Sequence, residues 1–417
     1  MTWMQGEIRR VAQVSLGKML QTSRKSENSF RASYVSAVAV QDRGLDHHAF
    51  KTMYFEPDEA EKLAIRKDDV LVVEGGSVGR SAYIESDLKE VYFQNSINRI
   101  RPYKGKSTGK FLFYVMSHLV SSGTVENACN KATIMHLTAE KLARLPLSIP
   151  PLEQQRAIAD FLDRETAEID AFIADQERLI ELLTERRTAT ITHAVTKGLD
   201  PSVPMRDSGI PWLGEIPAHW QAMRFSHFVR INAGQVDPRD ESYRDMTLIA
   251  PNHVESWTGR IRFKETAAEQ GADSGKYFAH AGQVIFSKIR PTLMKTVIAT
   301  ENVLCSADMY ALSTKSSVMS NEYLAVLLRS MPFHDYARDQ SMRVAMPKLN
   351  HETLNAAVFP VPSLNEQAEV LRMLRATTSG LDGMIADARQ AIELSKERRA
   401  ALISAAVTGQ IDVRTNG

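Results

Sequence analysis

The sequence predicts an α+β protein in which two mixed α/β regions are separated by two long helices that pair as an antiparallel coiled coil. Three observations support this fold class. One segment occurs twice, its apolar residues recur at helical spacing, and the other regions contain short apolar runs of strand length. We expect globular regions at residues 1–148 and 204–360 and long helices at residues 149–203 and 361–417.

The repeated segment is the clearest feature of the chain. Residues 150–200 align without a gap to residues 362–412, and about 21 of the 51 aligned positions are identical. This is far more than chance gives at one fixed offset. The chain therefore consists of two similar halves, and its globular regions have diverged more than its helices.

Both copies of the repeat are predicted to be long helices. Pro150 and Pro362 prevent an earlier helix start, and Gly198 and Gly409 lie where C-terminal caps are expected. Each helix must bury an apolar stripe, and the other copy offers a similar one. Because a globular region of about 150 residues connects the first helix to the second, we expect antiparallel pairing. The predicted seam consists of Ile158, Leu162, Ile169, Phe172, Leu179, Leu183, Val370, Leu374, Leu381 and Met384.

The globular regions are predicted to mix strands and helices. Residues 69–73 and 283–287 are apolar runs of strand length. Residues 111–116 and 323–328 occupy matching places in the two halves and are typical of short helices.

Composition excludes several classes of protein. The sequence contains no run of about 18 apolar residues, the length needed to span a membrane. The N-terminus lacks the apolar core of a signal peptide, so we expect a cytoplasmic protein without a membrane contact. Cys129 and Cys305 fit neither a disulfide framework nor a zinc site. The sequence contains no P-loop, no convincing carboxylate cluster of a metal nuclease and no Gly-x-Ser-x-Gly elbow. We therefore expect no catalytic site, metal or cofactor in this chain.

Charge is unevenly distributed, although the formal net charge is only +1. Residues 153–187 contain about ten acids against five bases, and residues 80–110 contain about seven bases against three acids. The basic stretch is either a solvated surface or a contact for nucleic acid, and both interpretations stay open at this point.

The start of each repeat copy resembles a known family. Residues 149–158 (IPPLEQQRAI), followed by the acidic helix and Glu185-Arg186-Arg187, resemble the central conserved region of the DNA-specificity subunit of type I restriction–modification enzymes. Residues 361–367 (VPSLNEQ) resemble the second conserved region of that family, and residues 212–220 (WLGEIPAHW) resemble the start of a target-recognition domain. Shorter matches to recognition-domain motifs lie at residues 69–77 and 93–102, so the resemblance covers essentially the whole chain.

The resemblance implies recognition of double-stranded DNA. Each globular region would be a target-recognition domain that reads one half of a bipartite site. The helix pair would set the spacer and dock two modification subunits, which supply S-adenosylmethionine, and restriction subunits would add chemistry that uses ATP and Mg. The alternative is a coiled-coil assembly scaffold whose globular halves bind protein rather than DNA.

Candidate contact residues follow from the chemistry of DNA. Arg suits guanine and Asn or Gln suits adenine, whereas Lys and Arg also contact phosphates. In the first half we expect DNA contacts from Arg80, Gln94, Asn95, Asn98, Arg99, Arg101, Lys104, Lys106, Asn130 and Lys131, and in the second half from Lys288, Arg290, Lys295, Arg343, Lys348 and Asn350. The cations shared by both repeat copies, Arg186, Arg187, Arg398 and Arg399, are either exposed residues favoured by the helix dipole or contacts for a shared partner.

Overall fold

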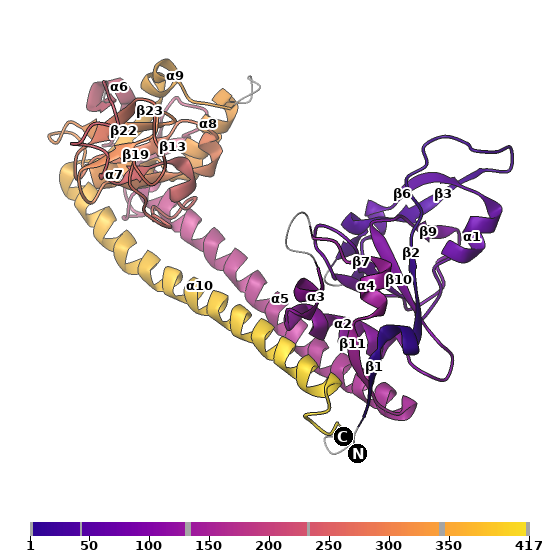
Figure 1. The fold of residues 1–417 in the computed structure, drawn as a ribbon. Coiled ribbons are helices and arrows are strands. Elements are labelled where there is room, and N and C mark those ends of the chain that lie inside the picture. The colour runs from indigo at the N-terminus through magenta and orange to yellow at the C-terminus, as the bar shows by residue number, and fades with distance from the viewer. Residues whose placement is uncertain (1–2, 42–43, 130–134, 232–233, 342–346, 414–417) are drawn as a thin grey trace. The chain divides into compact units, whose positions relative to one another are not determined.

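The fold comes from a computed structural model, which describes residues 3–41, 44–129, 135–231, 234–341 and 347–413 (Figure 1). The chain divides into two compact units, one formed by residues 1–177 and 389–417 and the other by residues 178–388. Each unit combines one globular region with one part of each long helix. These helices are α5 (Leu152–Lys197) and α10 (Leu364–Val407), within the predicted segments.

The globular region of the first unit contains two main sheets. An antiparallel sheet has the order β2 (Ala12–Leu16), β10 (Ile97–Pro102), β7 (Val70–Val73) and β8 (Ser81–Tyr83). A second sheet has β3 (Phe30–Val35) between β6 (Lys51–Phe55) and β9 (Val91–Phe93). Further elements are β1 (Met4–Glu7), β4 (Val40–Gln41), β5 (Gly44–Leu45), α1 (Pro57–Leu63), α2 (Gly109–Ser121), α3 (Thr124–Ala128), α4 (Ala139–Ala143) and β11 (Pro146–Ile149).

The globular region of the second unit repeats this plan. Its antiparallel sheet has the order β15 (Val229–Ile231), β22 (Met309–Thr314), β19 (Val284–Ser287) and β20 (Thr296–Ile298), which matches the first unit strand for strand. The second sheet has the order β16 (Gln235–Val236), β18 (Lys276–Ala279), β21 (Val303–Cys305) and β17 (Leu248–Ile249). Further elements are β12 (Met205–Asp207), β13 (Glu215–Pro217), β14 (Gln221–Arg224), α6 (Phe225–Phe228), α7 (Asn321–Leu327), α8 (Met331–Ser341), α9 (His351–Ala356) and β23 (Val358–Val361).

The predicted strands and short helices are confirmed. Strand β7 is buried on both faces, because Val70 and Val72 pack in one core with α2, while Leu71 and Val73 pack in another. Such a strand consists of a continuous apolar run without alternating polar residues. Strand β19 behaves alike, with Val284 and Phe286 packed against α7 and Ile285 in a separate core.

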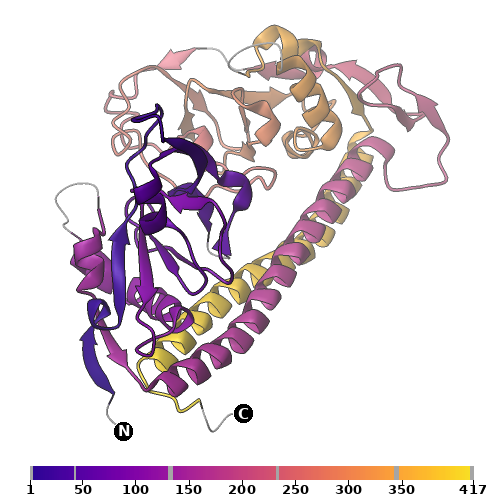
Figure 2. The same cartoon turned by 90° about the vertical axis from the view of Figure 1, so that its right-hand side faces the viewer.

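The two long helices pack against each other in an antiparallel manner within each unit (Figures 1 and 2). In the first unit Asp170 of α5 accepts two hydrogen bonds from Arg399 of α10, at 3.0 and 3.3 Å. In the second unit Asp382 of α10 accepts a hydrogen bond from Arg187 of α5 at 2.9 Å. Since residues 170 and 382 are matching positions of the repeat, as are 187 and 399, the duplication makes the same ion pair twice.

Two residues of the predicted seam were assigned to the wrong position. Phe172 is 45% exposed and Met384 is 50% exposed. The following residues, Ile173 and Ile385, are buried instead. Both positions of each pair are apolar, so apolarity alone does not identify the one that faces inward. The other predicted seam residues, Ile158, Leu162, Ile169, Leu179, Leu183, Val370, Leu374 and Leu381, are buried or half-buried.

A buried glutamine fixes the start of each long helix to its globular region. The Gln155 amide donates to the carbonyls of Lys106 and Pro150 at 3.1 and 2.9 Å, and its oxygen accepts from the Ser107 hydroxyl at 2.8 Å and the Thr108 N–H at 3.2 Å. Because Thr108 caps α2, this one side chain joins two helices.

Gln367 repeats this arrangement in the second unit. Its amide donates to the carbonyls of Val318 and Pro362 at 2.8 and 3.0 Å. Its oxygen accepts from the N–H of Ser320, the cap of α7, at 3.0 Å. Buried polar atoms of this kind are costly to leave without partners.

We expect Gln155→Ala to lower the free energy of unfolding by about 2–4 kcal/mol, because the substitution leaves buried carbonyls and N–H groups unpaired. Urea denaturation followed by circular dichroism measures the change. The matched control is Gln154→Ala, one residue earlier, where the side chain is half-buried. An equal loss in both variants would contradict the role assigned to Gln155.

A carboxylate also ties α10 to the start of the second globular region. Glu366 accepts from the Trp220 indole N–H at 3.0 Å, the Ser363 hydroxyl at 2.8 Å and the Ser363 N–H at 3.1 Å, and it lies 2.6 Å from His219 Nε2. Burial raises the pKa of Glu366, but hydrogen bonds from His219, Ser363 and Trp220 outweigh it and bring the pKa to about 2.

This pKa predicts a specific dependence of stability on pH. The folded carboxyl titrates below its ordinary value of 4.5, so its contribution is complete above pH 4.5 and is lost as the pH falls toward about 2. We expect Glu366→Gln to destabilise the protein by about 1–2 kcal/mol at pH 7 and by progressively less below pH 4.5. Denaturation of both proteins across this range, with exposed Glu369→Gln as control, measures the difference; a constant difference would refute the assignment.

Candidate nucleic-acid interface

In the first unit, the chain leaves β7 through a loop of residues 74–80, which we call loop L1. The Glu74 N–H donates to the Ser96 carbonyl at 2.9 Å, and the Glu74 carbonyl accepts from the Leu137 N–H at 2.8 Å. Gly75 forms a β-bridge with His136. These contacts join L1 to the residues before β10 and to the segment before α4.

In the second unit, the chain leaves β19 through residues 288–295, which we call loop L2. The Lys288 N–H donates to the Asp308 carbonyl at 2.9 Å, and the Lys288 carbonyl accepts from the Leu349 N–H at 2.9 Å. Residues 289 and 348 form the matching β-bridge. Loops L1 and L2 therefore start in the same backbone frame, which consists of two hydrogen bonds and one bridge.

Loop L2 gathers predicted DNA-contact residues. Lys288, Arg290, Lys295 and Lys348 all lie on L2 or on the segment bridged to it, and Arg290 and Lys348 are exposed. Burial lowers the pKa of Lys295, and the nearby cations of Arg262 and Arg290 lower it further. Such a concentration of positive charge favours an anion such as a phosphate group.

Two residues of L2 have a backbone conformation that side chains rarely adopt. Arg290 has φ of 44° and Met294 has φ of 48°, both in the left-handed region. This conformation costs free energy in residues other than glycine, and it is concentrated at binding sites. A cavity of about 570 Å³ lies beside these residues, with Arg290, Lys295 and Asp308 in its lining.

Loop L1 carries a different set of side chains. Arg80 is half-buried and donates to the Ala37 carbonyl at 3.3 Å. Gln94 and Asn95 lie beside Ser96, which L1 contacts, and the Gln94 oxygen accepts from the Ser96 hydroxyl at 3.0 Å. Burial raises the pKa of the Glu74 carboxyl. L1 and the residues beside it therefore offer two amides, one arginine and one carboxylate, where L2 offers mainly cations.

Comparisons with known proteins agree with this duplicated plan. The family model of the type I restriction modification DNA specificity domain matches residues 1–182 and again residues 217–394. The chain belongs to the type I restriction–modification DNA-specificity family.

Relatives match most of the chain in sequence, and one solved structure shares its fold. The EcoDI specificity subunit of Escherichia coli is 27% identical over 317 residues, which cover 72% of this chain and 70% of that protein. The MjaVIII specificity subunit of Methanocaldococcus jannaschii is 21% identical over 370 residues, covering 85% and 81%. A chain from a type I restriction–modification system, solved to study complex assembly and conformational transition, has the same fold with a TM-score of 0.71, 14% identity and 98% coverage of both chains.

Three of the predicted DNA-contact residues make hydrogen bonds within the first unit of the specificity subunit. Asn98 is fully buried and donates to the Leu137 carbonyl at 2.7 Å. Arg99, 2% exposed, donates to the carbonyls of Lys62 and Ala64 at 3.0 and 2.9 Å, and burial lowers its pKa to about 10. Arg101 makes two hydrogen bonds of 2.7 Å to the buried Asp69. The expectation of DNA contacts is therefore corrected for Asn98 and Arg99, and Arg101 is held by an internal ion pair.

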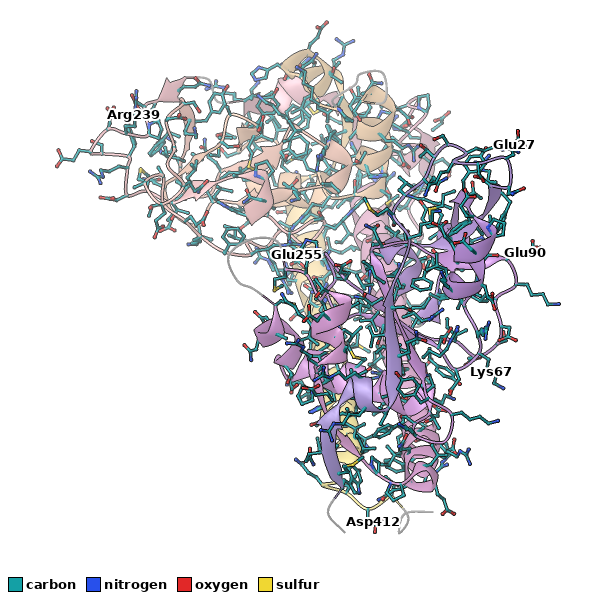
Figure 3. All side chains as sticks on the ribbon, turned by 45° about the vertical axis from the view of Figure 1, so that its right-hand side comes forward. Glu27, Lys67, Glu90, Arg239, Glu255 and Asp412 are labelled. Atoms are coloured by element: carbon teal, nitrogen blue, oxygen red, sulfur yellow. The ribbon has the colours of Figure 1, made fainter. Side chains whose placement is uncertain are left out.

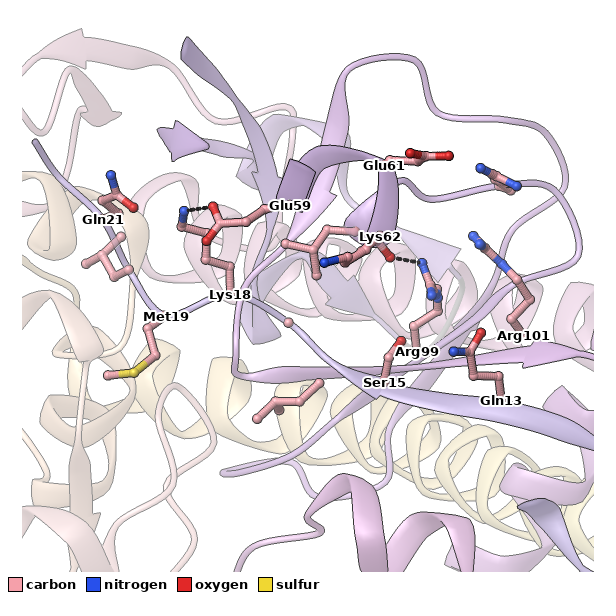
Figure 4. A pocket seen from close by; sticks show the side chains of 15 residues that line it. Gln13, Ser15, Lys18, Met19, Gln21, Glu59, Glu61, Lys62, Arg99 and Arg101 are labelled. Atoms are coloured by element: carbon pink, nitrogen blue, oxygen red, sulfur yellow. Dashed lines mark hydrogen bonds and ion pairs between the residues drawn. The ribbon is translucent and has the colours of Figure 1, made fainter. Parts of the chain in front are cut away.

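Arg99 and Arg101 also line a cavity of about 1070 Å³ (Figure 4). It lies where β2 and β10 approach α1, and Gln13, Ser15 and Met19 form other parts of its wall. Except for Met19, which follows β2, these side chains come from β2 and β10 and not from loop L1.

Other predicted residues lie apart from L1 or outside the described residues. Strand β10 pairs antiparallel with β7, with Ile97 opposite Val73, so Lys104 and Lys106 follow the end of β10 that is remote from L1. Both lysines are exposed. Asn350 is exposed and caps α9 by accepting from the Thr353 N–H at 2.7 Å, close to L2. Asn130, Lys131 and Arg343 lie outside the described residues and stay predictions.

The paired arginines of the specificity subunit's helices have two different roles. Arg187 is 8% exposed, and it also donates to the Trp257 carbonyl at 3.1 Å. Its counterpart Arg399 is half-buried in the ion pair with Asp170. These two side chains hold the helices together. Burial of Arg187 corrects its assignment to partner docking, whereas the docking role of half-buried Arg399 stays a prediction. Arg186 and Arg398 are exposed and stay candidates for docking.

Two other features, a membrane-spanning helix and a metal site, were considered within the described ranges. No helix there is long and apolar enough to cross a membrane. No group of three His, Cys, Asp or Glu residues in that part of the chain could hold a metal ion. Cys129 and Cys305 are buried and free. The predicted contacts included neither Glu74 nor His136, although the register of the duplication aligns His136 with the predicted contact Lys348.

Proposed function

We propose that this specificity subunit reads a bipartite site in double-stranded DNA. The region around L1 would contact one half of the site, and the region around L2 the other. The observation that carries the proposal is the shared backbone frame of the two loops, which presents different polar side chains in each unit. A protein that recognises two different half-sites needs a common scaffold with different reading groups.

The charge of L2 supports contact with nucleic acid. Arg290 and Lys348 are exposed cations, and Lys288 and Lys295 lie nearby as half-buried residues. Phosphate contacts orient a protein on DNA, and base contacts confer specificity. Beside L1 the amides of Gln94 and Asn95 suit adenine, and Arg80 of L1 suits guanine or a phosphate.

The helix pair supports a second part of the proposal. Arg186 and Arg398 are exposed at matching positions of the repeat, so they would form two equivalent docking sites for two modification subunits. These subunits would supply S-adenosylmethionine, and restriction subunits would bring ATP and Mg to the complex. The length of the paired helices would set the unread spacer. We place this complex in the cytoplasm.

We expect a bipartite methylated motif in the genome of a host that expresses this chain with its modification subunit. Methylome sequencing detects the motif directly. Replacing residues 1–148 by the same region of another specificity subunit should change one half of the motif and keep the other. A scaffold that binds protein would give no motif, and a change in both halves would refute separate reading by the two units.

We expect Arg186→Glu combined with Arg398→Glu to weaken assembly with modification subunits by about tenfold or more, since both exposed charges are reversed at the proposed docking sites. Size-exclusion chromatography and titration calorimetry measure assembly.

A matched control separates docking from stability. The double variant with Arg186→Glu and Arg398→Glu changes only exposed side chains, so its free energy of unfolding should change by no more than about 0.5 kcal/mol. Arg399→Ala, which breaks the partly buried pair with Asp170, should lower it by about 1–3 kcal/mol. Full assembly of the reversed variant would remove these arginines from the interface.

A further inference from the structure

The first residues of L1 and L2 are structurally equivalent. The N–H of Glu74 donates to the carbonyl just before β10, and the N–H of Lys288 donates to the carbonyl just before β22. The carbonyls of both residues accept from an N–H that lies two residues before a short helix, α4 in the first unit and α9 in the second. The next residue of each loop, Gly75 or Ile289, forms a β-bridge with His136 or Lys348, so these bridges also match. Because main-chain atoms make all these bonds, the side chains at the two positions are free to differ.

The two side chains differ in the sign of their charge. The Glu74 carboxylate is half-buried, and no group in the described ranges donates a hydrogen bond to it. Burial raises the pKa of this carboxyl, and the facing His136 opposes the shift. The Lys288 ammonium lies 5.3 Å from the centre of the Tyr310 ring, and none of the described carboxylates forms an ion pair with it.

The Glu74 carboxylate is unfavourable at a loop that contacts DNA, unless a partner stabilises it. Near DNA it is repelled by the phosphates, and partial burial without a donor makes its charged form less stable. Both costs are offset if a base supplies a hydrogen-bond donor. In the major groove, donors are the N4 amino group of cytosine and the N6 amino group of adenine, and Glu is a preferred acceptor for the former.

We propose that Glu74 and Lys288 are matched specificity positions, at which Glu74 accepts a hydrogen bond from the exocyclic amino group of a base in one half-site and Lys288 donates to the O6 and N7 acceptors of guanine in the other. This inference rests on the proposed function. The shared frame would place a hydrogen-bond acceptor at one point of the first half-site and a hydrogen-bond donor at the equivalent point of the second half-site. His136 beside Glu74 and Lys348 beside Lys288 would contact neighbouring phosphates or bases.

The test compares methylomes of hosts that express the modification subunit with wild-type chain, with Glu74→Gln or with Lys288→Gln. The Gln side chain keeps the length of Glu but adds a donor, which suits adenine. We expect Glu74→Gln to shift the base preference at one position of one half-site by about tenfold. We expect Lys288→Gln to relax the requirement for guanine at one position of the other half-site.

Matched controls are Glu27→Gln in the first unit and Arg239→Gln in the second. Both residues are exposed and lie at the periphery of their own units (Figure 3). They should leave the motif unchanged. If Glu74→Gln abolishes methylation altogether, the methylome is measured with Glu74→Lys instead. The base preference of this variant should move toward guanine at the same position of the motif.

The outcomes separate the inference from the proposed function. No bipartite motif with the wild-type chain would overturn the proposed function. A bipartite motif that is unchanged by Glu74→Gln and Lys288→Gln, or changed by both in the same half, would overturn the inference and leave the function intact. A purely structural role for Glu74 predicts a lower melting temperature in the Gln variant with an unaltered motif, whereas we expect an unchanged or raised melting temperature and an altered motif.

Discussion

The rest of the structure depends on the need of each long helix to bury its apolar stripe. A helix of 46 residues with such a stripe is not stable alone in water. In the first unit the start of α5 and the end of α10 complete the core, where Ile158 and Leu162 pack with Ile403 and Ala406. In the second unit the end of α5 and the start of α10 do the same. Each unit therefore combines segments that are distant in sequence.

Polar contacts fix the register that apolar packing leaves open. Apolar seams allow helices to slip by a turn, whereas a partly buried ion pair tolerates only one alignment. The Asp170–Arg399 and Asp382–Arg187 pairs provide this alignment once in each unit. Gln155 and Gln367 then attach the start of each helix to its globular region through hydrogen bonds with defined geometry. Since these contacts occur at matching positions of the repeat, they explain why the helices have diverged less than the globular regions.

The architecture could be predicted from the sequence, because duplication, helical spacing and buried strand runs are local patterns. The orientation of single side chains could not. Phe172 and Ile173 are both apolar, and small differences in helical phase decide which is buried. Asn98, Arg99 and Arg101 lie in β10, where residue type suggested DNA contacts. The strand instead places Asn98 and Arg99 inside, where they donate to main-chain carbonyls. Glu74 was missed because a carboxylate contradicts the simple expectation of positive charge at a DNA surface.

The two loops show how such a protein can change what it recognises while keeping its fold. Main-chain hydrogen bonds and one β-bridge hold the start of L1 and of L2, so neither loop depends on the chemistry of its first side chain. A substitution from carboxylate to ammonium at this point therefore costs the fold little, although it inverts the hydrogen-bonding character presented at the surface. Residues such as Arg99 and Arg101 are under the opposite constraint, because their cations hold the carbonyls and the carboxylate of the interior. Polar residues of one region thus divide into those that maintain the frame and those that are free to vary on it.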